Sequence, residues 1–262
     1  MFYAQKTFLS ETCVALLDNQ KRPIIYYWTR QEDVNLGDEY VCKITQKMPF
    51  IHGYFAQIDH NRNLFVESKK SLEIGQFMRV VITKEQRLDK VPQAKVLSAP
   101  STHETGLVKK GNLLQSINDS TFTEQVAWNE SFDEDVSESL NSLVFLECGA
   151  RIIFEQTHAF YSIDVDSANC TTDILTLNQL AAIRIGQEIV KRNLSGNIII
   201  DFMGHKDRQY MAQLKQLLAN ELQKDPTPYR IFGATSMGNM EIRRDRTRMS
   251  LSGASRTLPA VC

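Results

Sequence analysis

The chain has 262 residues, of which 42% are hydrophobic and 23% are charged, as in globular proteins with a sizeable core. Its net charge of −1 excludes a uniformly basic surface, so any nucleic-acid binding must use local basic patches. No apolar run reaches the ~18 residues of a membrane span, and the first residues lack a signal-peptide core. Five scattered cysteines favour reduced thiols, and we expect a cytoplasmic protein without a membrane span.

Two short apolar runs near the amino terminus predict a β-hairpin. Residues 14–17 and 24–28 have strand character, and the segment between them is rich in turn-forming residues. We expect this N-terminal segment, residues 1–36, to pack on the core.

Residues 37–98 contain short strand patterns separated by turns, which is typical of a small five-stranded barrel of the OB type. The predicted strands are 39–45, 54–58, 64–67 and 77–84. OB barrels bind single strands by stacking bases on exposed aromatic rings and by holding phosphates with basic side chains. Phe55 and Phe65 are candidate stacking platforms with Lys84 and Lys90 nearby, although an isolated phenylalanine in a strand is more often a core residue.

Residues 99–146 predict a linker and a short helix at about 134–140, whose acidic start suits the positive end of the helix dipole. Strand and helix patterns then alternate over residues 147–252, which predicts an α/β domain with a mixed sheet, followed by a tail at 253–262. The predicted elements are strands 151–155, 159–165, 197–201 and 229–234 and helices 177–192 and 208–223. We expect Gly196 to lie near the C-cap of the first of these helices.

Three aspartates lie near the ends of two predicted strands. Asp164 and Asp166 alternate with apolar residues, so both carboxylates project from one face of their strand. Asp201 follows a run of three isoleucines that is typical of a buried strand. A βαβ crossover brings the carboxyl ends of its two strands to one edge of the sheet, so these acidic ends meet. Asp164 and Asp201 are therefore candidate ligands for a hard cation such as Mg²⁺, with solvated strand ends as the alternative.

A basic stretch near the carboxyl terminus contains Arg243, Arg244, Arg246 and Arg248. Because guanidinium groups pair with phosphate bidentately, these arginines are candidates for holding a phosphate-bearing substrate. The alternative is a solvated helix face. His205 is a weaker candidate for contacting substrate or metal, since a lone histidine after a strand is more often structural.

Several stretches, in the same order and at similar spacing, resemble the ribonuclease E/G family of bacterial endoribonucleases. Residues 155–167 match the family's Glu-Gln-Thr-Glu-Ala segment, which runs into Ser-Ile-Asp-(Ile/Val)-Asn-Ser. Residues 194–202 continue the match. Residues 238–248 resemble Gly-Leu-(Val/Leu)-Glu-Met-(Thr/Ser)-Arg-x-Arg, and residues 37–98 resemble the family's S1-type RNA-binding barrel.

The resemblance implies both a fold and an activity. The fold is a mixed α+β chain in which an S1-like OB barrel follows the hairpin and precedes an α/β nuclease domain. The family residues that match Asp164 and Asp201 bind the catalytic Mg²⁺, and we expect that Mn²⁺ can replace it. The family residue that matches Asp166 is usually an asparagine, whose side chain orients the reaction centre. Phe55, Phe65 and Lys90 fall where the family contacts RNA. The implied reaction is hydrolysis of phosphodiester bonds in single-stranded RNA, in rRNA processing or mRNA decay.

The chain also departs from the family pattern. Residues 99–146 are too short for the family's 5′-monophosphate pocket and lack its Arg-Thr pair. Only Cys262 falls at the family's Cys-Pro-x-Cys zinc link, and one cysteine per chain cannot complete a tetrahedral site. We therefore expect neither structural Zn²⁺ nor a zinc-linked tetramer, and we leave a homodimer open. A family arginine is also missing near Ser236, so the alternatives to an endoribonuclease are an inactive RNA-binding relative and a DNA nuclease.

Overall fold

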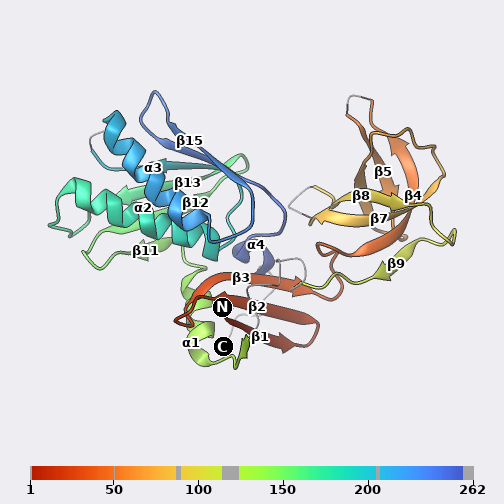
Figure 1. The fold of residues 1–262 in the computed structure, drawn as a ribbon, viewed down its shortest axis with the longest axis horizontal. Coiled ribbons are helices and arrows are strands. Elements are labelled where there is room, and N and C mark those ends of the chain that lie inside the picture. The colour runs from red at the N-terminus through yellow and green to blue at the C-terminus, as the bar shows by residue number, and fades with distance from the viewer. Residues whose placement is uncertain (1, 50, 87–89, 114–123, 205–206, 256–262) are drawn as a thin grey trace.

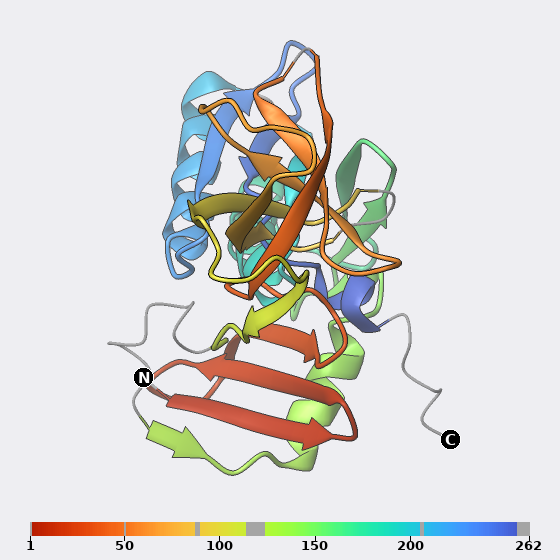
Figure 2. The same ribbon diagram turned by 90° about the vertical axis from the view of Figure 1, so that its right-hand side faces the viewer.

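The computed structural model describes residues 2–49, 51–86, 90–113, 124–204 and 207–255. The described residues form three sheets, which we call the N-terminal sheet, the barrel and the C-terminal sheet. The N-terminal sheet lies beneath the other two in the views of Figures 1 and 2. No helix in these residues is long and apolar enough to cross a membrane. His205, Cys262 and the tail from residue 256 onward lie outside the described part of the chain.

The N-terminal sheet contains the predicted hairpin and two further strands. Its order is β10-β1-β2-β3, with β1 Phe2–Phe8, β2 Glu11–Leu17, β3 Pro23–Arg30 and β10 Glu124–Val126. The antiparallel β2–β3 pairing confirms the hairpin. Helix α1, Glu130–Glu138, packs its Phe132 and Val136 against this sheet and begins earlier than predicted. Residues 99–146, predicted as a linker and a short helix, thus contribute strand β10 to this sheet and a helix that packs on it.

The barrel confirms the predicted OB-type fold and has its own hydrophobic core. Its strands are β4 Glu39–Lys47, β5 Gly53–Gln57, β6 Asn63–Glu67, β7 Phe77–Lys84 and β8 Gln93–Ser98, in the order β5-β6-β8-β7-β4. A β4–β5 pairing closes the ring. A further strand, β9 Gly106–Lys109, pairs with β4, so the barrel sheet extends beyond the predicted end at residue 98.

The chain enters and leaves the barrel through one neck. Asp38 is fully buried there and accepts hydrogen bonds from the backbone N–H of Asn35 (3.0 Å) and of Gly111 (2.8 Å). The Lys110 ammonium lies 3.0 Å from the same carboxylate. A Cβ atom on Gly111 would lie 2.5 Å from the carbonyl oxygen of Leu36, so only glycine permits this approach. The barrel is thus an insertion after β3.

The C-terminal sheet has six strands in the order β11-β12-β13-β14-β16-β15. They are β11 Leu143–Phe145, β12 Arg151–Gln156, β13 Phe160–Asp166, β14 Gly196–Asp201, β15 Tyr229–Ala234 and β16 Met240–Arg244. Helices α2 Ile174–Lys191 and α3 Arg208–Leu222 follow β13 and β14, and the short helix α4 Leu251–Ser255 comes last. Because β13 and β14 are parallel and the other pairs are antiparallel, the mixed sheet and the βαβ crossover are both confirmed.

Helix α2 ends at Lys191 with Arg192 as its C-cap, and the left-handed residue that follows is Asn193 rather than Gly196. Asn193 adopts the left-handed conformation (φ 50°), and the next N–H, of Leu194, bonds to the carbonyl oxygen of Ile189. Gly196 instead begins β14, where it also has a positive φ of 96°. The prediction for Gly196 was therefore wrong, because Asn193 occupies the left-handed position after the helix, which asparagine tolerates.

The two faces of the C-terminal sheet differ in how deeply their side chains are buried. Ile163 of β13 and Ile198 and Ile200 of β14 are fully buried in a core that they share with α2 and α3. The alternate side chains on these strands, including Asp164 and Asp201, are exposed or half-exposed on the other face. We call this second face the open face.

A buried ion pair fastens the barrel to the end of the C-terminal sheet. Glu85, just after β7, lies 3.3 Å from the Arg248 guanidinium and accepts hydrogen bonds from the N–H groups of Leu36 (3.1 Å) and Met249 (3.2 Å). Both charged side chains are less than a tenth exposed, and Arg248 also lies over the ring of Tyr27. Arg248 was predicted to bind RNA, but this buried pairing gives it a structural role instead.

Candidate functional site

Asp164 and Asp201 are directly opposite each other on the parallel strands β13 and β14. Register partners on neighbouring strands project from the same face, and both carboxylates are exposed on the open face. The pKa of Asp164 is raised by partial burial and then by the negative charges of Asp201, Asp166 and Glu155. The structure thus concentrates negative charge at this end of the open face, as a cation would require.

Asp166 lies two residues further along β13, but its charge is compensated. Its carboxylate accepts hydrogen bonds from Arg151 Nε (2.8 Å) and from the N–H of Ala168 (2.9 Å). These two donors, led by the Ala168 N–H, lower the pKa of Asp166. A carboxylate held by its own arginine suits an orienting role better than that of a metal ligand.

Two further carboxylates extend the acidic end of the open face, and our sequence analysis did not identify them. Glu155 of β12 is opposite Ser162, and Glu241 of β16 is opposite Ile199, so each lies one step from the aspartate pair. Both are exposed. The alternation of β12 could have revealed Glu155, whereas Glu241 was missed because residues 240–244 were interpreted as part of a basic stretch and not as a strand.

The aspartate pair has the donor chemistry for Mg²⁺. Mg²⁺ is usually bound through one or two carboxylates, with water and substrate phosphates completing its shell. Within the described residues no group of three or more histidine, cysteine, aspartate or glutamate side chains is placed to hold a metal. Asp164 and Asp201, on opposing register positions, therefore fit a magnesium site that is completed by water and substrate.

A basic cleft of about 330 Å³ lies between the barrel and the C-terminal sheet. Lys84 and Lys90 line it from the barrel, Asn197 and Arg243 from the sheet, and Arg246 from the segment after β16. These basic groups outnumber the two acidic residues of the lining, Glu85 and Asp245. Asn197 and Arg243 are register partners, and both are exposed on the open face. Asn197 precedes Asp201 by four residues on β14, which at ~3.3 Å per residue separates the cleft from the aspartates by about 13 Å. The cleft and the acidic end thus belong to one continuous face.

The two predicted aromatic platforms lie on the paired barrel strands β5 and β6, and β6 also pairs with β8, which contributes Gln93 to the cleft. Phe55 and Phe65 are half-exposed on the barrel, with ring centroids 5.9 Å apart in an edge-on arrangement, so neither is a core residue. Phe65 lies across Gly53, where a Cβ atom would come within 1.9 Å of the ring. Its register partner on β8 is Gln93, which lines the basic cleft. Phe65 is therefore one strand away from the cleft and Phe55 two strands away, and their contact with RNA stays a prediction.

Arg244 is not available to a ligand, although it was predicted to bind RNA. It is 1% exposed and pairs with the buried carboxylate of Asp225. Its Nη1 also donates hydrogen bonds to Asn193 Oδ1 and to the carbonyl oxygen of Leu194, each at 2.8 Å. The prediction failed because Arg243 and Arg244 are neighbours on a strand, so only one of them can point to the open face.

Comparison with known proteins identifies the family. The profile of the Ribonuclease E/G family matches residues 39–247, which include the barrel, the basic cleft and the aspartate pair. The chain belongs to the ribonuclease E/G family. This confirms the predicted resemblance and places the chain in a family of endoribonucleases.

Individual members of the ribonuclease E/G family match part of the chain. Ribonuclease G of Haemophilus influenzae is 34% identical over 122 residues, which is 44% of this chain and 25% of that protein. Ribonuclease G of Escherichia coli K12 is 28% identical over 125 residues, covering 45% and 26%. Ribonuclease E of Synechocystis is 33% identical over 122 residues, covering 44% and 18%. The aligned part of the chain thus spans about a quarter or less of these relatives.

Proposed function

We propose that the protein is a Mg²⁺-dependent endoribonuclease that hydrolyses phosphodiester bonds in single-stranded RNA. The observation that carries this proposal is the pairing of Asp164 with Asp201 on a face whose other end opens into a basic cleft. Membership of the ribonuclease E/G family supports the same conclusion.

The chemistry of the face suits a single RNA strand. Lys84, Lys90, Arg243 and Arg246 line the cleft and attract the phosphates, and Phe55 and Phe65 offer ring surfaces to bases. Only unpaired bases can stack on such rings, so the arrangement favours single strands over duplexes. The strand would run from the barrel across the cleft to the aspartates.

The residues of the acidic end have distinct parts in this proposal. Asp164 and Asp201 would hold Mg²⁺, with Mn²⁺ as a substitute. When bound, the metal would activate a water molecule and stabilise negative charge on the scissile phosphate. Asp166, held in place by Arg151, would orient the attacking or the leaving group.

The decisive experiment compares the wild-type chain with Asp164→Asn on an A/U-rich, end-labelled RNA in the presence of Mg²⁺. We expect the wild type to cut and the variant to be slower by about 100-fold or more, because a metal ligand is lost. Chelation of the metal should stop the wild type as well. Glu134→Gln, an exposed carboxylate on α1, is the matched control and should cut normally.

The substrate class is tested with the same sequence in three forms. The single-stranded RNA should be cut, whereas the RNA annealed to its complement and the corresponding DNA should resist. Cleavage of the DNA would favour a DNA nuclease instead. A wild-type chain that binds the RNA but leaves it intact with either metal would show a non-catalytic RNA-binding relative.

A further inference from the structure

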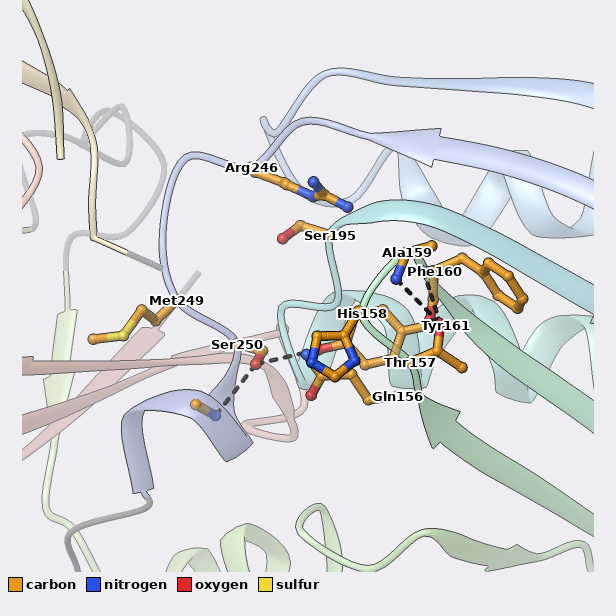
Figure 3. Close-up of a pocket in the computed structure, with 11 residues that line it drawn as sticks. Gln156, Thr157, His158, Ala159, Phe160, Tyr161, Ser195, Arg246, Met249 and Ser250 are labelled. Carbon is orange, nitrogen blue, oxygen red and sulfur yellow. Dashed lines mark hydrogen bonds between the residues drawn. The ribbon is translucent and has the colours of Figure 1, made fainter. Parts of the chain in front are cut away.

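A second cavity, of about 190 Å³, lies at the amino ends of β13 and β14, and Figure 3 shows the residues that line it. It is surrounded by the turn between β12 and β13, by Ser195 and Arg246, and by the segment that leads into α4. We call it the end pocket. None of the roles proposed above involves it, although Arg246 also lines the basic cleft.

The lining of the end pocket is rich in hydrogen-bond donors. It includes the Arg246 guanidinium, the His158 imidazole and the hydroxyl groups of Ser195, Ser250 and Tyr161. None of its lining residues, all of which the structure describes, carries a carboxylate, although acids slightly outnumber bases in the whole chain. A cavity with an arginine, several hydroxyls and no carboxylate is complementary to an anion.

The donors are held in place by the surrounding backbone. A Cβ atom on Gly196 would lie 2.1 Å from Arg246 Nη2, so the glycine lets the guanidinium rest directly on the backbone at the start of β14. On the other side, Ser250 Oγ accepts hydrogen bonds from Tyr161 Oη (3.4 Å) and from the N–H of Gly253 (3.3 Å). These bonds leave the Ser250 proton for Ser252 Oγ or for a ligand.

The end pocket is continuous with the proposed path of the RNA. Arg246 lines both the end pocket and the basic cleft, so a strand in the cleft reaches the pocket by passing this one side chain. The pocket is also distant from the acidic end. Phe160, in its wall, precedes Asp164 by four residues of strand, or about 13 Å, so one phosphate cannot occupy both places.

We propose that the end pocket is a subsite that binds one backbone phosphate of the RNA, several nucleotides away from the bond that is cut. Arg246 supplies positive charge and directional donors, His158 supplies a further ring donor, and Ser195 and Ser250 complete the set. The ligand is identified as RNA on the basis of the proposed function. A strand long enough to reach the end pocket therefore binds more tightly than a shorter one.

The test is a binding series with the full chain in the absence of divalent metal. Oligouridylates of increasing length are titrated and followed by fluorescence anisotropy. His158→Ala and the double variant His158→Ala/Ser195→Ala should not affect the shortest strands, and the double variant should weaken binding of the longer ones about tenfold. Asn197→Ala, at a residue that lines the cleft and not the end pocket, should weaken every length that binds.

A matched control removes a charge elsewhere. Lys215→Ala lies on α3, which covers the opposite face of the sheet, and should leave all affinities unchanged. Thermal unfolding of each variant verifies the fold. The single His158→Ala change should not lower the melting temperature, because this side chain is exposed. The proposal is wrong if the double variant binds every length as the wild type does. It is equally wrong if the variant weakens the shortest strands as much as the longest.

The outcome is independent of cleavage, because binding is measured without metal. A length-dependent loss of affinity in a chain that never cuts RNA would support the end pocket and overturn the proposed enzyme. If the wild-type chain cuts RNA but the double variant loses no affinity for the longer strands, the proposed enzyme is supported and the end pocket is overturned.

Discussion

The acidic end of the open face and the buried arginines at the other end of the C-terminal sheet use charge in opposite ways. Asp164 faces Asp201 and other carboxylates, and this repulsion adds to the effect of burial on its pKa. Arg244 and Arg248, in contrast, are buried against Asp225 and Glu85. A charge that is surrounded by like charges is available to a ligand, whereas a charge with a buried partner stabilises the fold. The variants below test this difference.

Removing Arg244 should have the largest effect. Arg244→Ala leaves the fully buried Asp225 carboxylate without its ion pair, which costs about 3–5 kcal/mol of unfolding free energy. Urea denaturation measures this loss. Arg243→Ala, one residue earlier and exposed, is the matched control and should change the unfolding free energy by less than about 0.5 kcal/mol. Equal losses in the two variants would contradict the distinction between the arginines.

Removing either aromatic platform should have the second-largest effect, on the affinity for RNA. Phe55→Ala and Phe65→Ala should each weaken binding of single-stranded RNA by ~1–2 kcal/mol, or about tenfold, because a stacked base loses its ring partner. The control is Phe77→Ala, whose half-exposed ring already packs on His103 at 5.2 Å between centroids. An equal loss in this control would mean that the cleft side of the barrel has no special role.

Arg243→Ala should have a smaller and more specific effect on binding. Because the side chain faces the cleft, its loss should weaken RNA binding several-fold. It should also reduce the slope of log affinity against log salt concentration by about 0.7, the contribution of one phosphate contact on a single strand. Arg22→Ala, in the turn before β3, should leave the slope unchanged. An unchanged slope for Arg243→Ala would place this arginine outside the RNA path.

The smallest expected effect distinguishes two neighbouring aspartates. In metal-free protein at neutral pH, Asp164→Asn should raise the melting temperature by up to about 3 °C, since it removes a repelled but partly screened charge. The pKa of Asp164 is raised, so the wild type loses stability as the pH rises through that pKa, and the advantage of the variant should vanish in acid.

Asp166→Asn should have the opposite sign. The pKa of Asp166 is lowered by the Ala168 N–H and Arg151, so this carboxylate contributes stability above its unfolded pKa and loses it as the pH falls. Its replacement should therefore lower the melting temperature at neutral pH. Scanning calorimetry at neutral and acid pH resolves both changes, and shifts of the same sign would refute the assignment of different roles.

The features that were predictable from the sequence depend on local patterns. The alternation around Asp164 and the crossover rule placed the acidic strand ends at one edge, and the turn spacing gave the barrel. Strands β9 and β10 are three or four residues long and pair with partners far away in the chain, so no local signal identifies them. The same is true of the Glu85–Arg248 pair, whose members are separated by 163 residues. Long-range pairing also divided the arginine stretch into exposed and buried members.

The neck at Asp38 has a consequence for how such a protein can be assembled. Because the chain leaves the N-terminal sheet and returns to it at one point, the barrel is a self-contained insertion. One insertion after β3 would add a closed sheet with its own core to an existing two-sheet protein without changing the order or register of any other strand. The same neck marks where the barrel could be exchanged for another domain whose two ends lie equally close together.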